Sequence, residues 1–300
     1  MPYQFRPDHA PGDEARRIAT EQIDRAIAEL DHESADVAIH QFRKRCKKLR
    51  ALFRTLRAFD ADLFRRENRR FRDLAREHAE ARDAAARIET IEHLIAQNPG
   101  NNPPKALRKA HAALESELAA LHDADDSVRD RLQATQKQLE RARHDTAAWK
   151  LTGLEWKHLI KAVTRTYKQG RDAWQAALDT PTDEQLHEWR KQVKYLGYQS
   201  QMIGALWTAQ FDAMGGTLDE LADALGDIHD AAVLMQQLSR DDHGLTTRDL
   251  QAIGKRCERW RTERIEITAR LGGLIYAETP KAFRARLDGY AEANAASPDR

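Results

Sequence analysis

Residues 39–57 read IHQFRKRCKKLRALFRTLR, and this stretch holds eight basic residues and no acidic one. An α-helix turns by about 100° per residue, so the stretch can be placed on a helical wheel. One face then gathers cationic side chains and the opposite face is apolar. The cationic face consists of His40, Arg43, Lys44, Lys47, Arg50 and Arg54, and the apolar face of Phe42, Cys46, Leu49, Phe53 and Leu56. The stretch therefore predicts an amphipathic helix with an anion-binding face.

A second copy of the opening pattern lies at residues 186–198, LHEWRKQVKYLGY. On the same wheel one face carries His187, Arg190, Lys191, Lys194 and Tyr198, and the other carries Trp189, Val193, Leu196 and Ile203. The two histidines are 147 positions apart (187 − 40), and this offset stays in register through the following loop. It pairs Phe42 with Trp189, Arg43 with Arg190, Lys44 with Lys191, Lys47 with Lys194, Phe64 with Phe211 and Asp83 with Asp230. A chance match of a short motif would not keep register so far, so we expect two homologous halves related by an approximate two-fold axis.

The composition favours a helical protein. Charged residues make up 32% of the chain, while only 14 of its 300 residues are glycine and 9 are proline. These values are typical of helical rather than β-rich proteins, and no segment sustains the period-two pattern of a strand. We therefore predict an all-α fold. The formal net charge is only +1, so the basic charge is concentrated locally, which favours a defined site over a nonspecific basic tail.

Breaks in the periodicity divide the chain. The clearest break is QNPGNNPP at residues 97–104. The predicted helices cover 13–30, 36–59, 62–96, 105–146, 149–178, 186–206, 211–238, 250–271 and 280–295, with Gly272-Gly273 ending the eighth. The expected organisation is an irregular lead-in at 1–12, a first half at 13–147, a second half at 148–275, and a C-terminal helix and tail at 276–300.

Two cysteines, Cys46 and Cys257, are too few for a disulfide framework and suggest a reducing compartment. Cys46 falls on the apolar face of its helix, so we expect a buried, inert thiol. No apolar run approaches the ~20 residues of a membrane span, and the N-terminus lacks the order of a secretory signal. We expect a cytoplasmic protein with no membrane contact.

Two basic helices placed face to face would line a groove or channel with like charges, which repel each other. Such an arrangement indicates a polyanion that neutralises it. Arginine offers forked donors to phosphate oxygens, lysine a point charge, and histidine a switchable donor. The segment before the second basic helix could add Arg165, Lys168 and Arg171 to the rim. The alternative is a set of solvated helix faces, against which the acid-free first stretch and its in-register copy argue.

The pattern H-x-x-R-K-x-x-K at 40–47 and again at 187–194 resembles the CHAD domain (conserved histidine α-helical domain). Arg82-Asp83 and the run from Gly226 to Asp230 resemble that family's downstream motif, and the resemblance extends from about residue 13 to residue 271. It implies two antiparallel four-helix bundles around a basic central pore that binds inorganic polyphosphate without catalysis. The pore residues implied by position are His40, Arg43, Lys44, Lys47, His187, Arg190, Lys191 and Lys194. The wider expected set adds Lys48, Arg50, Arg54, Arg82, Arg165, Lys168, Arg171, Tyr198 and His229.

The two sides of such a pore would not be equivalent, because Arg50 corresponds to Gly197 and Arg82 to His229. Some family members carry a triphosphate-hydrolysing domain with an E-x-E-x-K motif, which this sequence lacks. It also has no phosphate-binding G-x-x-x-x-G-K-[ST] loop, G-x-S-x-G elbow or zinc spacing. We therefore expect no catalytic residues, metal or cofactor.

Other functions stay open. A basic groove also attracts nucleic acid, although the basic stretches lack the exposed aromatic residues that stack bases, and near-zero net charge is unusual for such proteins. An enzyme acting on phosphate anhydrides would need metal and carboxylate ligands that the basic helices lack. A helical scaffold for a protein partner would bind every polyanion weakly. If polyphosphate is the ligand, storage, granule attachment and signalling all remain open as its purpose.

Overall fold

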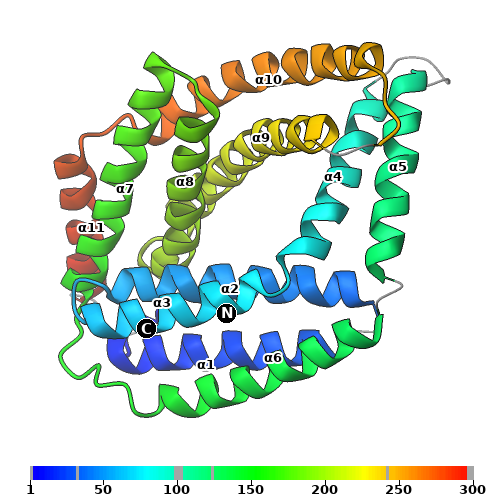
Figure 1. Ribbon diagram of the computed structural model, residues 1–300. Coiled ribbons are helices and arrows are strands. Elements are labelled where there is room, and N and C mark those ends of the chain that lie inside the picture. Colours follow the sequence, from blue (N-terminus) through cyan, green and yellow to red (C-terminus); the bar gives the residue numbers. More distant parts are fainter. Residues whose placement is uncertain (1–2, 32–33, 98–103, 123–124, 241–242, 296–300) are drawn as a thin grey trace.

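The computed structural model describes residues 3–31, 34–97, 104–122, 125–240 and 243–295. All regular structure in these ranges is helical, which confirms the all-α prediction (Figure 1). The helices are α1 (Pro11–Leu30), α2 (Ala35–Leu56), α3 (Ala61–Arg76), α4 (Ala79–Ala96), α5 (Lys105–His122), α6 (Asp125–Thr146), α7 (Trp156–Asp179), α8 (Asp183–Ile203), the short 3₁₀ helix η1 (Gly204–Leu206), α9 (Thr208–Arg240), α10 (Thr247–Ile275) and α11 (Pro280–Ala295). The two basic stretches form α2 and α8.

Several helices begin at residues whose side chains satisfy the free N–H groups of the first turn. The Asp60 carboxylate accepts hydrogen bonds from the backbone N–H groups of residues 62 and 63. Thr182 forms a capping box with Gln185 at the start of α8, and Thr246 forms one with Asp249 at the start of α10.

The expected single helix over 62–96 is instead two helices, α3 and α4, and the prediction was wrong there. The break falls at His78, which is buried and whose Nε2 forms a hydrogen bond of 2.8 Å with the Thr135 hydroxyl of α6. Its ring also meets the edge of Phe42, with centroids 5.6 Å apart. Arg43 Nη1 donates to the Ala75 carbonyl over 2.6 Å and so satisfies an acceptor at the end of α3. The break is therefore made by tertiary contacts, because the local sequence is helix-forming.

Two other predicted boundaries also differ. The expected helix over 105–146 consists of α5 and α6, which lie on either side of residues 123–124 and run in different directions (Figure 1). Conversely, α10 continues through Gly272-Gly273 to Ile275, where a break was expected.

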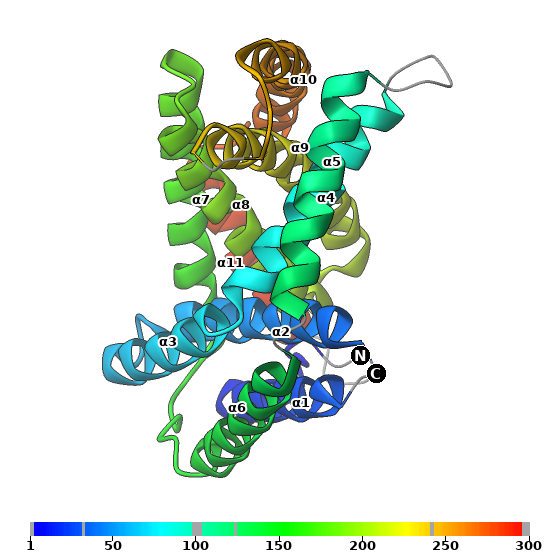
Figure 2. The same ribbon diagram turned by 45° about the vertical axis from the view of Figure 1, so that its right-hand side comes forward.

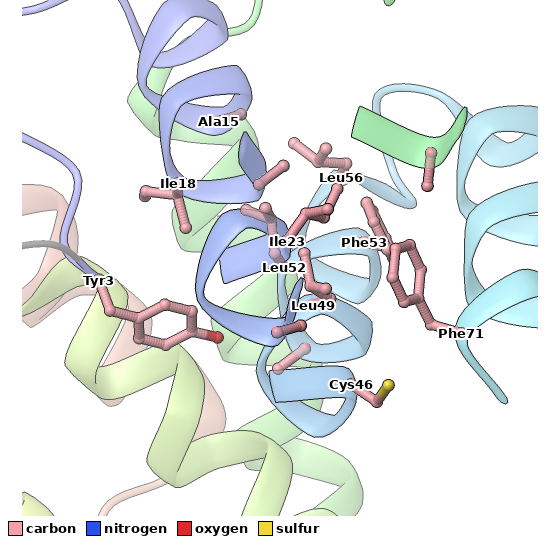
Figure 3. Close-up of a cluster of buried hydrophobic side chains, with 14 of the residues drawn as sticks. Tyr3, Ala15, Ile18, Ile23, Cys46, Leu49, Leu52, Phe53, Leu56 and Phe71 are labelled. Atoms are coloured by element: carbon pink, nitrogen blue, oxygen red, sulfur yellow. The ribbon is translucent and has the colours of Figure 1, made fainter. Parts of the chain in front are cut away.

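The first hydrophobic core joins α1, α2, α3 and α6 (Figure 3). The apolar face of α2 lies at its centre, and the rings of Phe53 and Phe71 stack with centroids 5.6 Å apart. Tyr3 and Phe5, which precede α1, also pack into this core. The predicted apolar face of the first basic helix is thereby confirmed.

The second core joins α7, α8, α9 and α11. Trp189 of α8 is fully buried in it, as predicted from the wheel. Tyr167 of α7 stacks on Phe283 of α11, with centroids 4.0 Å apart. The basic face of α8 is therefore turned away from this core.

A third core joins α4 and α5 to α9 and α10, and so crosses the expected boundary between residues 147 and 148. Its members include Ile91, Leu107, Leu234 and Trp260. Because α4 diverges from α3 at His78, it reaches across to α9. In Figures 1 and 2 the helices consequently form a frame, with α2 and α3 along one side, α7 and α8 along the next, α10 opposite α2, and α4 and α5 closing the fourth side. The long helix α9 runs from beside α8 to beside α10. None of the described helices is both long and apolar enough to cross a membrane.

Candidate functional site

The basic face of α2 is open to solvent along much of its length. His40, Lys44 and Lys47 are exposed, whereas Arg43, Lys48, Arg50 and Arg54 are half-buried. On the other face Cys46 is buried, and burial raises the pKa of its thiol to about 12 against the opposing effect of nearby cations. The expectation of a buried thiol is confirmed, and the raised pKa keeps it protonated and unreactive.

Some basic residues of α2 hold neighbouring helices. Arg45 forms an ion pair with Glu29 of α1, with Nη2 and Oε1 2.5 Å apart. Arg43 binds the end of α3, as described above. Lys48 lies 4.7 Å from the ring centroid of Tyr3, and burial, followed by nearby cations of α1 and α2, lowers its pKa to about 8. Lys48 therefore loses its proton at a lower pH than an ordinary lysine does.

The helices α2 and α8 meet through the C-terminal part of each. Arg50 Nη2 donates to the Tyr195 hydroxyl over 3.2 Å, and the Arg54 guanidinium lies over the Tyr195 ring at 3.9 Å. Gln199 of α8 donates to Thr55 of α2 over 3.1 Å. The N-terminal ends of the two helices, which carry His40 and His187, diverge toward different corners of the frame (Figure 1). The structure thus brings Arg50 and Arg54 to α8 but leaves the two histidines apart.

A second group of predicted residues gathers around Asp219 of α9. Burial, followed by Asp223, raises the pKa of Asp219, while Lys194 of α8 and Lys44 of α2 are close enough to act in the opposite direction. Burial, followed by Asp219, raises the pKa of Tyr198. Lys44, Lys194 and Tyr198 therefore converge on one carboxylate from two basic helices.

Burial, followed by Arg190, lowers the pKa of Lys194. Three carboxylates of α9 oppose this effect: Asp223, Asp219 and Asp230. Asp230 belongs to the downstream motif identified in the sequence, but Asp219 and Asp223 were missed. Their spacing of four residues, in line with Asp230, is a sequence signal that could have identified them.

A third group lies near the start of α8. The rings of His187 and His229 are 4.7 Å apart, and burial, followed by Arg190, lowers the pKa of both. Both rings are therefore predominantly neutral at pH 7. The Arg190 guanidinium passes Gly226 so closely that a methyl group there would lie 3.4 Å from Nη2. Its buried Nε has no hydrogen-bond partner in the part of the chain that the structure describes. Lys191 is exposed and pairs with Glu188 of the same helix.

A pocket of about 390 Å³ lies at the corner where α2 ends, the first half of α7 passes and α11 begins. Among the described residues that line it, six are cationic and none is acidic; the cations are Arg54, Arg57, Lys161, Arg165, Lys168 and Arg284. We call it the corner pocket. The structure thus unites three predicted residues with Arg57, Lys161 and Arg284, which were missed. Lys161, Arg165 and Lys168 share one face of α7 at i, i+4 and i+7, a pattern visible in the sequence.

The remaining predicted residues lie elsewhere. Arg171 donates from Nε to the Tyr276 carbonyl over 3.3 Å, outside the corner pocket. The side chain of Arg82 lies outside the described residues. Within the described ranges, no group of three or more His, Cys, Asp and Glu side chains could hold a metal ion.

Comparison with known proteins agrees with the residue pattern. The family model described as CHAD domain matches residues 17–239. The fold is similar to the crystal structure of the CHAD domain from the plant Ricinus communis, with a TM-score of 0.66 and 17% sequence identity, over 96% of this chain and 95% of that one. No curated protein sequence matches. The family match covers well over half of the chain, and this protein therefore belongs to the CHAD domain family.

Proposed function

We propose that this protein binds inorganic polyphosphate, without hydrolysing it, through the cationic faces of α2 and α8. The observation that carries the proposal is the basic face of α2, which is acid-free from Ile39 to Arg57, exposes Lys44 and Lys47, and runs into its crossing with α8. Arginine and lysine on this face supply the donors that phosphate oxygens accept. A linear polyanion suits a long cationic face better than a compact ligand does.

We further infer that the two basic helices are duplicates that face a shared pore. The helix bounds support this inference, since α3 begins at Ala61 and α9 at Thr208, which are 147 positions apart, as the two histidines are. The same offset relates α2 to α8 within a residue at each end. In this interpretation the broken helix α3–α4 corresponds to the continuous helix α9.

The two sides of such a pore differ in charge. On one side, Asp219 and Asp223 of α9 lie near Lys194 of α8. On the other side, the corresponding positions of α3 are Arg72 and Arg76, both exposed. Lys191 is also paired with Glu188. The α2 side is consequently the more cationic one, and we propose that it contributes more of the affinity.

Replacing Lys44 and Lys191, which correspond under the offset, tests the proposal. Both are exposed, so Lys44→Ala with Lys191→Ala should leave the fold and its thermal midpoint unchanged. Each lost phosphate contact should reduce the slope of log K against log salt by about one, so the double variant should lose about two for medium-chain polyphosphate.

The matched control is Lys255→Ala with Arg259→Ala on α10, two exposed cations that line none of the groups described above. Calorimetric titrations at several salt concentrations should show no change in slope for this control. An unchanged slope in the folded Lys44/Lys191 variant would overturn the proposal. Release of orthophosphate from polyphosphate by the wild-type protein would overturn the non-catalytic part.

A further inference from the structure

The corner pocket differs in charge balance from the basic groups around Lys194 and Lys191. Lys194 faces three carboxylates and Lys191 pairs with one, but four cations of the corner pocket form no ion pair among the described residues: Arg54, Arg57, Lys161 and Arg165. Lys168 and Arg284 each pair with an aspartate of their own helix. Like charges that lie close together without counterions repel one another, so a bound anion would stabilise this pocket.

Individual side chains in the pocket also show the effect of this crowding of cations. Burial, followed by nearby Arg165 and Arg54, lowers the pKa of Arg57. The Arg54 Nε and the Thr164 hydroxyl are buried without a hydrogen-bond partner among the described residues, although both residues line the pocket. Buried polar groups in native proteins are nearly always paired, with protein, water or ligand. These two groups stand beside three further cations without an ion pair in the described ranges, Arg57, Lys161 and Arg165, and together they point to a bound ligand that accepts hydrogen bonds.

The shape and lining limit the class of anion. Ligand sites for small molecules range from about 300 to 1,000 Å³, and this pocket, at about 390 Å³, is near the lower end. The uncharged lining residues are aliphatic or polar, with Ala162, Pro280 and Gln169 among them, and none of the described lining residues has an aromatic ring that could stack a base. Pro280 opens α11, so the positive end of that helix dipole adds to the field. The pocket therefore suits a compact cluster of phosphate groups and not a nucleotide.

We propose that the corner pocket binds a compact oligophosphate of a few units, separately from the cationic faces of α2 and α8. Only Arg54 belongs to both, since the other five cations come from the end of α2, from α7 and from α11. The ligand is either a free short oligophosphate or the terminal units of a longer chain. The second source rests on the proposed function above, whereas the first does not.

The test uses Lys161→Ala with Arg165→Ala, which removes two exposed cations one helical turn apart. The Lys44→Ala/Lys191→Ala variant reports on the α2–α8 faces. Lys255→Ala with Arg259→Ala is the matched control, because these are also exposed, four residues apart and on one helix. Thermal unfolding confirms that each variant is folded, and calorimetry measures tripolyphosphate and medium-chain polyphosphate binding.

We expect the Lys161/Arg165 variant to lose roughly tenfold or more in tripolyphosphate affinity, and the other two variants less than about threefold. Parallel loss of medium-chain binding in the Lys161/Arg165 variant would identify the chain end as the ligand, and unchanged medium-chain binding would identify the free oligophosphate. Absence of tripolyphosphate binding to the wild-type protein, unchanged affinity in the Lys161/Arg165 variant, or an equal loss in the Lys44/Lys191 variant would overturn the proposal. Tripolyphosphate binding without medium-chain binding would instead overturn the proposed function and leave the corner pocket standing.

Discussion

Neighbouring basic residues that are similar in the sequence have different roles in the structure. Arg43 donates to a backbone carbonyl at the end of α3, whereas its neighbour Lys44 is exposed. Arg190 packs against Gly226, and Lys191 next to it pairs with Glu188. Replacing Arg43 or Arg190 would therefore disturb local structure as well as charge. Lys44 and Lys191 are the cleaner positions at which to test binding.

His78 should make the stability of the fold depend on pH. Burial, followed by the nearby cations Arg131 and Arg43, lowers its pKa from about 6.5 to about 4. The unfolded chain takes up a proton below about pH 6.5 and the folded chain only near pH 4, so falling pH favours unfolding across this window. The contribution of His78 to the free energy of unfolding should fall by about 2 kcal/mol between pH 7 and pH 5.

Urea unfolding of the wild-type protein and of His78→Gln, at pH 7 and pH 5, measures this contribution. The variant lacks the titrating group, so its free energy of unfolding should fall less than that of the wild-type protein. The comparison uses the difference between two pH values, so a constant packing cost of the substitution cancels. Equal pH dependence in the two proteins would show that His78 is not held neutral.

Among the helices, α10 illustrates how glycine can serve packing instead of ending a helix. Gly272 lies so close to α7 and α8 that a Cβ would be 2.8 Å from Trp189 Cζ2 and closer still to Trp174. Gly273 has room, since its Cβ would be 3.9 Å from Trp174. The sequence pattern indicates a break at this pair, but a periodicity argument cannot register the approach of two tryptophans from other helices.

The pair Gly272 and Gly273 provides an internally controlled test of this packing. Gly272→Ala should lower the free energy of unfolding by about 1–3 kcal/mol, because the added methyl group forces Trp174 and Trp189 to move. Gly273→Ala should leave it unchanged or raise it by up to about 1 kcal/mol, as expected for alanine in a helix. Chemical denaturation measures both. A destabilised Gly273→Ala with a neutral Gly272→Ala would contradict the observed packing.

For the whole molecule, the helical class, the two amphipathic basic helices and the family could be predicted from the sequence. Periodicity assigns a face to each helix, and the wheel placed Phe53, Cys46 and Trp189 correctly in the cores. It does not say which helix packs on that face. The break at His78 and the third core depend on contacts between segments far apart in the chain, and local propensity opposes the break.

The same limit applies to the candidate site. The basic motif pointed to α2 and α8, but it could not reveal that Asp219 and Asp223 lie beside Lys194 or that Tyr195 bridges Arg50 and Arg54. The corner pocket draws cations from α2, α7 and α11, which are separated by more than a hundred residues. Only the packing of the three helices brings these charges together.

Calorimetric binding of medium-chain polyphosphate to the wild-type protein at two salt concentrations, with duplex DNA as comparator, tests the proposed function most directly. We predict binding that is tighter than that of DNA and weakens steeply as salt is raised, because phosphate contacts release condensed counterions. Weak binding, or equal affinity for polyphosphate and DNA, would contradict a polyphosphate site and leave the basic faces of α2 and α8 as general polyanion-attracting surface.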